Sequence, residues 1–285
     1  MQNVLKGRSS LEKNNVINGL PIKDIYYANN DVVLVNNDSL EYLKCLPGNS
    51  IDMIFADPPY FGNQSNLVIN RTDGHKPTFD TQKATWAFSM DLVKQFEFHH
   101  TWLSESKRLL KDDGTIWITG TYHSIGVVNV VLQDLKYKIL NDIILVKRNA
   151  PPNFTGSCFR AISETMLWAK KSTEGRKKWN YSTMKQINGG VQMNNVWEYW
   201  AEKNPFRHPA TKQQIILEKV ILAASHEGDI VLDPFAGSGT TGYVCKGLNR
   251  KCLMIEIEES YCKLISKRLS GEFGAFQPKI KYEKI

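Results

Sequence analysis

The sequence contains no apolar run near the roughly 20 residues that a membrane span needs. Its opening residues, MQNVLKGRSSLEKNN, mix charged and polar side chains and hold no apolar core of a secretory signal. We therefore expect a cytoplasmic protein without a membrane partner. Cysteine is scarce, because only 5 residues of 285 are cysteine, and they form neither a C-x-x-C pair nor a metal-ligand spacing. We expect no disulfide framework and no metal.

The composition is that of a folded globular chain. Hydrophobic residues make up 42% and charged residues 23%, which is unlike a disordered sequence. The 36 basic and 29 acidic residues give a net charge of +7, a modest indication of a polyanionic partner. No internal repeat is visible, and the length suits one large α/β domain or two small ones. One domain over residues 1–285 with inserted loops is the simplest description.

Short apolar runs alternate with helical patterns along the chain. The runs rich in β-branched residues cover 32–35, 51–55, 115–119, 143–146, 230–232 and 253–257. Helical spacing of apolar residues covers 96–110, 215–224 and 261–269. Continuous apolar strands alternating with helices predict a doubly wound, mostly parallel α/β sheet.

Two stretches depart from this alternation. Residues 61–89 are polar and show little periodicity, so we expect a functional loop. Residues 170–206 carry seven basic and three acidic residues together with several tryptophans and tyrosines. This composition fits either a solvated face or a surface that contacts nucleic acid.

A glycine-rich loop lies near the C-terminus. The segment 230–242, IVLDPFAGSGTTG, contains G-S-G-T-T-G between a predicted strand and a predicted helix. Such glycines allow a tight turn, and the helix start offers free N–H groups to a nucleoside cofactor. Glu256 ends the next predicted strand, where a carboxylate can bind ribose hydroxyls. No lysine follows the glycines, which excludes the nucleoside triphosphate P-loop; a plain structural turn is the alternative interpretation.

The glycine-rich loop comes late in the chain. Only 43 residues follow Gly242, so most of the sheet must come from the N-terminal side. This permuted order disfavours an NAD-linked dehydrogenase, whose second nucleotide-binding half normally follows the first.

The predicted strand at 51–55 leads into D-P-P-Y at residues 57–60. A rigid turn accounts for the prolines but not for the flanking Asp57 and Tyr60. The Asp57 carboxylate can accept one N–H of a nucleobase amine, and the Pro58 carbonyl can accept the other. Pro59 has no N–H and a fixed φ, which holds that carbonyl in place. Tyr60 offers a flat face on which an extruded base can stack.

D-P-P-Y followed by D-P-F-A-G-S-G-T-T resembles the S-adenosylmethionine-dependent DNA amino-methyltransferases of bacterial restriction–modification systems, in their permuted β-class order. The resemblance spans residues 30–270. It implies a Rossmann-like methyltransferase fold, circularly permuted, with a mostly parallel seven-stranded sheet. The segments 143–146 and 165–168 would form its antiparallel hairpin. It also implies an enzyme that flips adenine out of double-stranded DNA and methylates the N6 amine.

The resemblance assigns roles to individual residues. It implies catalytic roles for Asp57, Pro58, Pro59 and Tyr60. It implies that the cofactor is S-adenosylmethionine, bound by Asp38, Asp57, His208, Lys212, Asp233, Phe235, Gly237, Gly239, Thr240, Thr241 and Glu256. Within that set, Asp38 would meet the adenine amine, Glu256 the ribose and Lys212 the methionine carboxylate. The segment 207–213 keeps His208, Pro209 and Lys212 of the family's H-P-T-Q-K-P and differs at the remaining positions.

The DNA contacts are expected in the two stretches that depart from the α/β pattern. Arg71 and Lys76 in the 61–89 loop and Lys177, Lys178 and Lys185 in a candidate target-recognition region at 170–206 are the expected phosphate-binding residues. Cytosine-N4 methylation is the nearest alternative. An NAD-linked oxidoreductase, a catalytically silent DNA-binding module and methylation of RNA or a protein amide are further alternatives. Both a monomer and a homodimer remain open, as does the target DNA sequence.

Overall fold

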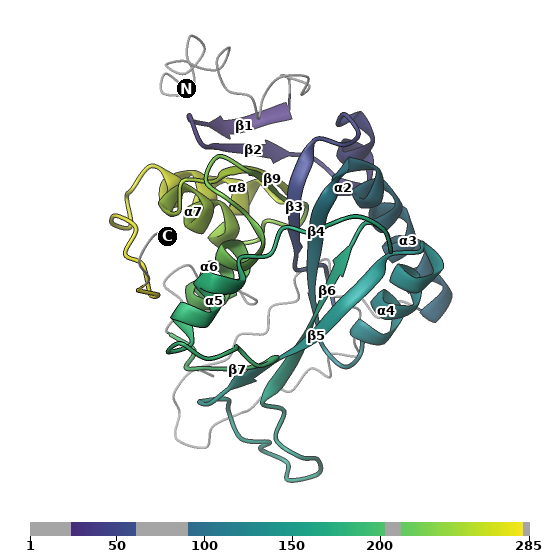
Figure 1. The fold of residues 1–285 in the computed structure, drawn as a ribbon, viewed down its shortest axis with the longest axis vertical. Coiled ribbons are helices and arrows are strands. Elements are labelled where there is room, and N and C mark those ends of the chain that lie inside the picture. Colours follow the sequence, from purple (N-terminus) through teal and green to yellow (C-terminus); the bar gives the residue numbers. More distant parts are fainter. Residues whose placement is uncertain (1–23, 61–90, 203–211, 282–285) are drawn as a thin grey trace, which may run out of the picture.

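The computed structural model describes residues 24–60, 91–202 and 212–281. These residues build a nine-stranded sheet in the order β1-β2-β9-β8-β3-β4-β6-β5-β7 (Figure 1). The strands are β1 (Ile25–Ala28), β2 (Val32–Asn36), β3 (Ile51–Ala56), β4 (Leu110–Gly120), β5 (Lys138–Lys147), β6 (Ser163–Lys170), β7 (Val196–Tyr199), β8 (Ile230–Asp233) and β9 (Lys251–Glu256).

Helices pack on both faces of the sheet (Figure 1). One face holds α2 (Ser39–Tyr42), the short 3-10 helix η2 (Leu43–Cys45), α3 (Leu92–Leu109) and α4 (Ile125–Asp134). The other holds α5 (Tyr181–Ile187), α6 (Gln214–Ala224), α7 (Thr240–Gly247) and α8 (Glu259–Leu269). Strand β2 shows why two cores form, because Val32 and Leu34 enter one core and Val33 and Val35 the other. No helix in the described ranges is long and apolar enough to cross a membrane.

The strand directions confirm the expected mixed topology. Strands β2, β9, β8, β3 and β4 run parallel to one another, and β6 runs antiparallel to β4 and to β5. The β5–β6 pair is therefore the predicted antiparallel hairpin. The sheet has two strands more than the seven expected, namely the edge strands β1 and β7. Each has only four residues, too few to stand out as a hydrophobic period.

The permuted order brings two distant motifs together. Strand β3, which precedes D-P-P-Y, pairs in parallel with β8, which precedes the glycine-rich loop. All the parallel strands end at one edge of the sheet, which we call the carboxyl edge. Strands β5 and β7 also end there, and β6 begins there, since Ser163 pairs with Val146 and Thr165 with Gly120. The topology therefore gathers these strand ends in one place.

The segment 170–206 is part of the fold as far as the structure describes it. It leaves the end of β6 opposite the carboxyl edge, forms α5 and returns as β7 beside β5. The expected loop at 61–89 lies outside the described residues.

Candidate functional site

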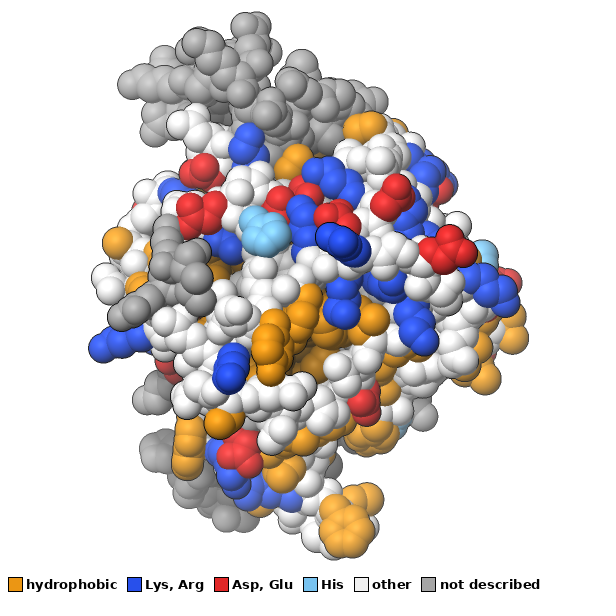
Figure 2. All heavy atoms as spheres, viewed as in Figure 1, with side chains coloured by type: hydrophobic (Ala, Val, Ile, Leu, Met, Phe, Trp, Pro, Cys, Tyr) orange, Lys and Arg blue, Asp and Glu red, His pale blue; other side chains and the backbone are white. Residues whose placement is uncertain are grey.

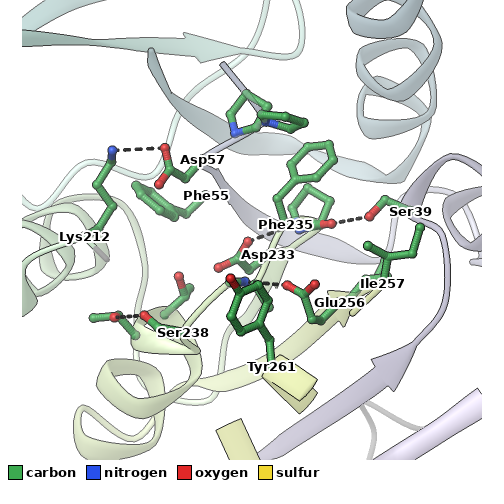
Figure 3. Close-up of a pocket in the computed structure, with 18 of the residues that line it drawn as sticks. Ser39, Phe55, Asp57, Lys212, Asp233, Phe235, Ser238, Glu256, Ile257 and Tyr261 are labelled. Carbon is green, nitrogen blue, oxygen red and sulfur yellow. Dashed lines mark hydrogen bonds and ion pairs between the residues drawn. The ribbon is translucent and has the colours of Figure 1, made fainter. Parts of the chain in front are cut away.

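A pocket opens at the carboxyl edge, and its walls come from the ends of β2, β3, β8 and β9 (Figure 3). Its lining includes most of the site residues expected from the sequence: Asp38, Asp57, Pro58, Pro59, Tyr60, Lys212, Asp233, Phe235, Gly237, Thr240, Thr241 and Glu256. Two motifs separated by about 180 residues along the chain thus share one cavity. His208 lies outside the described residues.

The glycine-rich loop adopts a backbone that requires glycine. Gly237 and Gly239 have φ of +54° and +72°, in the left-handed region that side chains disfavour. A Cβ on Gly239 would also lie 2.8 Å from Cγ2 of Ile265. Gly239 does not line the pocket; it is the N-cap of α7 and allows that helix to begin against α8.

Arg268 fixes the same loop from α8. Its Nη1 donates to the Ser238 carbonyl and to Oγ1 of Thr240, at 3.0 Å each. Burial lowers the pKa of the Arg268 guanidinium to about 10. Sequence reasoning missed this residue, because a basic residue in the last turn of a helix is common.

Glu256 points into the pocket from the end of β9 (Figure 3). Its Oε2 accepts the N–H of Gly237 at 2.7 Å and its Oε1 accepts the N–H of Glu258 at 2.9 Å. Burial raises the pKa of Glu256 to about 7, although both N–H groups oppose this shift. The carboxylate therefore connects the glycine-rich loop to the strand end and still faces the cavity.

Asp233 is the last residue of β8 and is only 2% exposed. It accepts the N–H of Phe235 at 3.0 Å, which bends the chain into the glycine-rich loop. Burial raises the pKa of its carboxyl to about 7. Phe235 packs edge-on against Trp102 with ring centroids 5.3 Å apart and also lines the pocket. Asp233 thus shapes the wall that Phe235 presents.

Asp38 follows β2 and lines the pocket. Its side chain caps α2 by accepting the N–H of Leu40 at 2.8 Å. The next residue, Ser39, donates its hydroxyl to the Pro234 carbonyl, which ties this turn to the glycine-rich loop (Figure 3). Asp38 is therefore a helix cap that also faces the cavity. Ile257 and Tyr261 complete this wall, and sequence analysis did not identify them.

Asp57 stands where β3 ends. Its Oδ1 accepts hydrogen bonds from the Tyr60 hydroxyl and, at 2.6 Å, from Oγ1 of Thr119, and lies 3.0 Å from Nζ of Lys212. These three contacts, all between described residues, end on Oδ1. Sequence analysis missed Thr119, which lies near the end of the neighbouring strand β4. Its place beside Asp57 follows from the register that pairs Ala56 with Ile118, and only the fold sets that register.

Lys212 lines the pocket and contacts the D-P-P-Y motif, while its expected role toward the methionine carboxylate stays a prediction. Its Nζ contacts Asp57, the Tyr60 hydroxyl at 2.7 Å and Oε2 of Glu164 at 2.9 Å. Burial by itself would lower the pKa of Lys212, but Asp57, Tyr60 and Glu164 raise it well above its usual range. An ammonium has three N–H donors, and these three partners can use all of them. The contacts therefore direct Lys212 to the D-P-P-Y motif.

Of the expected DNA-binding residues, the three that the structure describes do not line the pocket. Arg71 and Lys76 are outside the described residues. Nζ of Lys178 lies 2.6 Å from Asp52 and 2.8 Å from Asp229, at the edge of the sheet opposite the carboxyl edge. Lys177 lies over the Trp168 ring, and Lys185 is exposed on α5. The described part of the chain holds no group of three metal-ligating side chains.

Comparison with known proteins gives one family and several close relatives. The profile of a DNA methylase family matches residues 51–267. The type II methyltransferase M2.DpnII of Streptococcus pneumoniae is 41% identical over 256 residues, which cover 87% of this chain and 92% of that protein. The type II methyltransferase M.HinfI of Haemophilus influenzae is 39% identical over 83% of this chain and 67% of its own length.

Two solved structures share the fold. The complex of M1.HpyAVI with SAM has a TM-score of 0.59 and 25% identity, over 84% of this chain and 98% of that one. The cytosine-N4-specific PvuII DNA methyltransferase has a TM-score of 0.68 and 18% identity, over 86% of this chain and 88% of that one. At that identity, the PvuII enzyme supports the fold alone.

Proposed function

Because this chain belongs to the DNA methylase family, we propose that it transfers a methyl group to the N6 amine of adenine in double-stranded DNA. Membership makes it an S-adenosylmethionine-dependent DNA methyltransferase of the restriction–modification type. The NAD-linked alternative does not survive this assignment. We propose four further points: the target base is adenine, the substrate is duplex DNA, single residues have the roles given below, and the protein acts in the cytoplasm, where the DNA lies.

The pocket has the donors and acceptors that S-adenosylmethionine needs. Glu256 would accept the ribose hydroxyls, and Asp38, which follows the neighbouring strand β2, would accept the adenine amine. Phe235, Ile257 and Tyr261 give the apolar walls for the purine. When bound, the cofactor would supply a methyl group carried on a positively charged sulfonium sulfur, and the target amine would lose one proton on methylation.

The observation that carries the proposal is the position of Asp57. It ends the strand beside β8, in the same cavity as Glu256, so a base amine held there faces the cofactor pocket. Asp57 and the Pro58 carbonyl would accept the two N–H groups and leave the nitrogen lone pair free toward the methyl group. Tyr60 would stack on the base. Catalysis would rest on positioning and electrostatics.

Adenine is preferred to cytosine because of the residue at position 57. The resemblance drawn from the sequence associates Asp at this position with adenine-N6 enzymes and Ser more often with cytosine-N4 enzymes. Oδ1 of Asp57 holds three donors, which the hydroxyl of a serine, with two lone pairs, could not match. These contacts therefore favour Asp over Ser at position 57.

The β5–β6 hairpin supports a duplex substrate at the carboxyl edge. It projects from that edge at the bottom of Figure 1 and carries Phe154 and Phe159, which are 61% and 100% exposed. Between Lys147 and Ser163 all charged residues are basic. In Figure 2 hydrophobic side chains protrude at this lower end of the molecule. Exposed aromatic rings among cations suit contact with bases and phosphates.

The test is to incubate the purified protein with unmethylated duplex DNA and S-adenosylmethionine, digest the DNA to nucleosides and measure their masses. The expected product is N6-methyl-2′-deoxyadenosine. N4-methylcytosine as the only product would establish the alternative. An Asp57→Asn variant is the control for contaminating activity and should give neither product.

A further inference from the structure

Glu164 connects the hairpin strand β6 to the D-P-P-Y motif. It lies next to Ser163, the first residue of β6, and its Oε2 is 2.9 Å from Nζ of Lys212. The same Nζ is 3.0 Å from Oδ1 of Asp57. The Lys212 side chain is 12% exposed and that of Asp57 14%, so this pair is largely desolvated, whereas the Glu164 side chain is 36% exposed and its charge is partly screened by solvent. A single lysine thus lies between two carboxylates.

The geometry limits how Lys212 can move. Its three N–H donors match Asp57, Tyr60 and Glu164, and the Tyr60 hydroxyl in turn donates to Asp57. Without Glu164, one donor of Lys212 would be released and could turn toward another acceptor in the pocket. The lysine would then hold Asp57 less firmly.

The net charge of this cluster also matters for methyl transfer. Asp57 and Lys212 alone sum to zero, and Glu164 makes the cluster negative by one unit. Positive charge is present on the sulfonium of the methyl donor before transfer and on the amine nitrogen during transfer. A net negative cluster at the pocket stabilises both, whereas a neutral one does not.

We propose that Glu164 is a positioning residue of the methyl-transfer site: it fixes Lys212 on Oδ1 of Asp57 and supplies the negative charge that offsets the lysine. This assignment rests on the proposed function, because it presupposes that Asp57 holds the target amine. It does not depend on whether that amine belongs to adenine or cytosine.

The test compares Glu164→Gln with the wild-type protein by calorimetry. The variant should weaken the binding of S-adenosylmethionine relative to S-adenosylhomocysteine by several-fold, because only the former carries the sulfonium charge. Its single-turnover rate of methyl transfer should fall about tenfold or more. Glu164→Asp keeps the charge and should recover part of both effects.

Glu174→Gln is the matched control, since it removes the same charge from an exposed residue beyond the other end of β6. It should leave the rate and the affinity ratio unchanged. An unchanged ratio in Glu164→Gln would overturn the proposal, whatever happens to the rate, because a packing defect does not distinguish sulfonium from thioether. A wild-type protein that binds neither compound would instead refute the proposed function.

Discussion

Two carboxyl groups of the pocket, Asp233 and Glu256, have pKa values near 7, so the charge of each depends on pH near neutrality. Burial raises the pKa of Glu256 to about 7. Between pH 4.5 and 7 the folded chain therefore holds a proton on this carboxyl group that the unfolded chain releases. The contribution of Glu256 to stability is therefore fully present below pH 4.5 and is lost as the pH rises through 7. A ribose that donates to this carboxylate favours its ionised form.

We expect the affinity for S-adenosylmethionine to rise about fivefold to tenfold between pH 6 and pH 8, as Glu256 loses its proton. Calorimetric titration at several pH values measures this. Glu256→Gln should bind more weakly and lose most of the pH dependence, because an amide does not titrate. Equal pH profiles for the two proteins would remove Glu256 from ribose binding.

Asp57 should affect catalysis much more than cofactor binding. Asp57→Ala removes the acceptor for the target amine, and loss of one such group costs roughly 10²–10³ in rate. The affinity for S-adenosylmethionine should stay within a few-fold. Asp112→Ala, at a side chain that is 92% exposed, is the control. A rate above one tenth of wild type in the Asp57 variant would contradict its proposed role.

At the scale of single elements, the β5–β6 hairpin is the segment that we connect with DNA. Phe159→Ala should weaken binding of duplex DNA by about 1–2 kcal/mol, because it removes a fully exposed ring from the carboxyl edge. Fluorescence anisotropy of a labelled duplex measures this loss. Phe273→Ala removes a half-exposed ring that lies outside the hairpin and should leave the affinity for DNA unchanged. Equal affinities for both variants and the wild type would place the DNA elsewhere.

The elements themselves were largely predictable. The helix expected at 215–224 is α6 (Gln214–Ala224), and the segments 143–146 and 165–168 lie within β5 and β6. Helix α3 begins four residues earlier than expected, because Asp91 caps it by accepting the N–H of Lys94. Strand β7 was not predicted. It has four residues, and only its pairing with β5 makes it a strand.

The site was predictable where a role follows from local sequence. Asp57, Gly237 and Glu256 lie in the expected cavity because each is tied to a strand end. Glu164 and Thr119 were not predicted as site residues. Their contacts with the site depend on strand register, which no local sequence pattern encodes. The contacts of Lys212 with Asp57 and Glu164 were not predictable either, because these partners lie far away in the sequence.

At the scale of the whole molecule, the sheet has two edges with different roles. The carboxyl edge holds the pocket, and the opposite edge holds a buried ion network in which Lys178 and Lys111 contact Asp52. The Asp52 side chain is only 3% exposed, and it also accepts the N–H of Ile230. This network links β3, β4 and the start of β8, so we interpret it as structural.

Lys178→Ala should therefore destabilise the protein without altering the electrostatics of DNA binding. The variant leaves Asp52 with Lys111 and the N–H of Ile230 but takes a buried charged partner from Asp52 and Asp229, which costs about 1–3 kcal/mol. Denaturant unfolding measures this loss. The slope of log K against log salt for DNA binding should match that of wild type. Lys177→Ala, at an exposed neighbour, should leave the stability within about 0.5 kcal/mol. A salt slope reduced by about one unit in Lys178→Ala would instead make Lys178 a phosphate contact.

Whether this chain methylates adenine at N6 can be decided by sequencing DNA with a method that reports modified bases. The DNA would come from a host without its own methyltransferases that expresses either the wild-type protein or Asp57→Ala. We predict N6-methyladenine at one short sequence in the wild-type sample and at none in the variant sample. N4-methylcytosine in place of methyladenine, or an unmodified genome with folded wild-type protein present, would contradict the account.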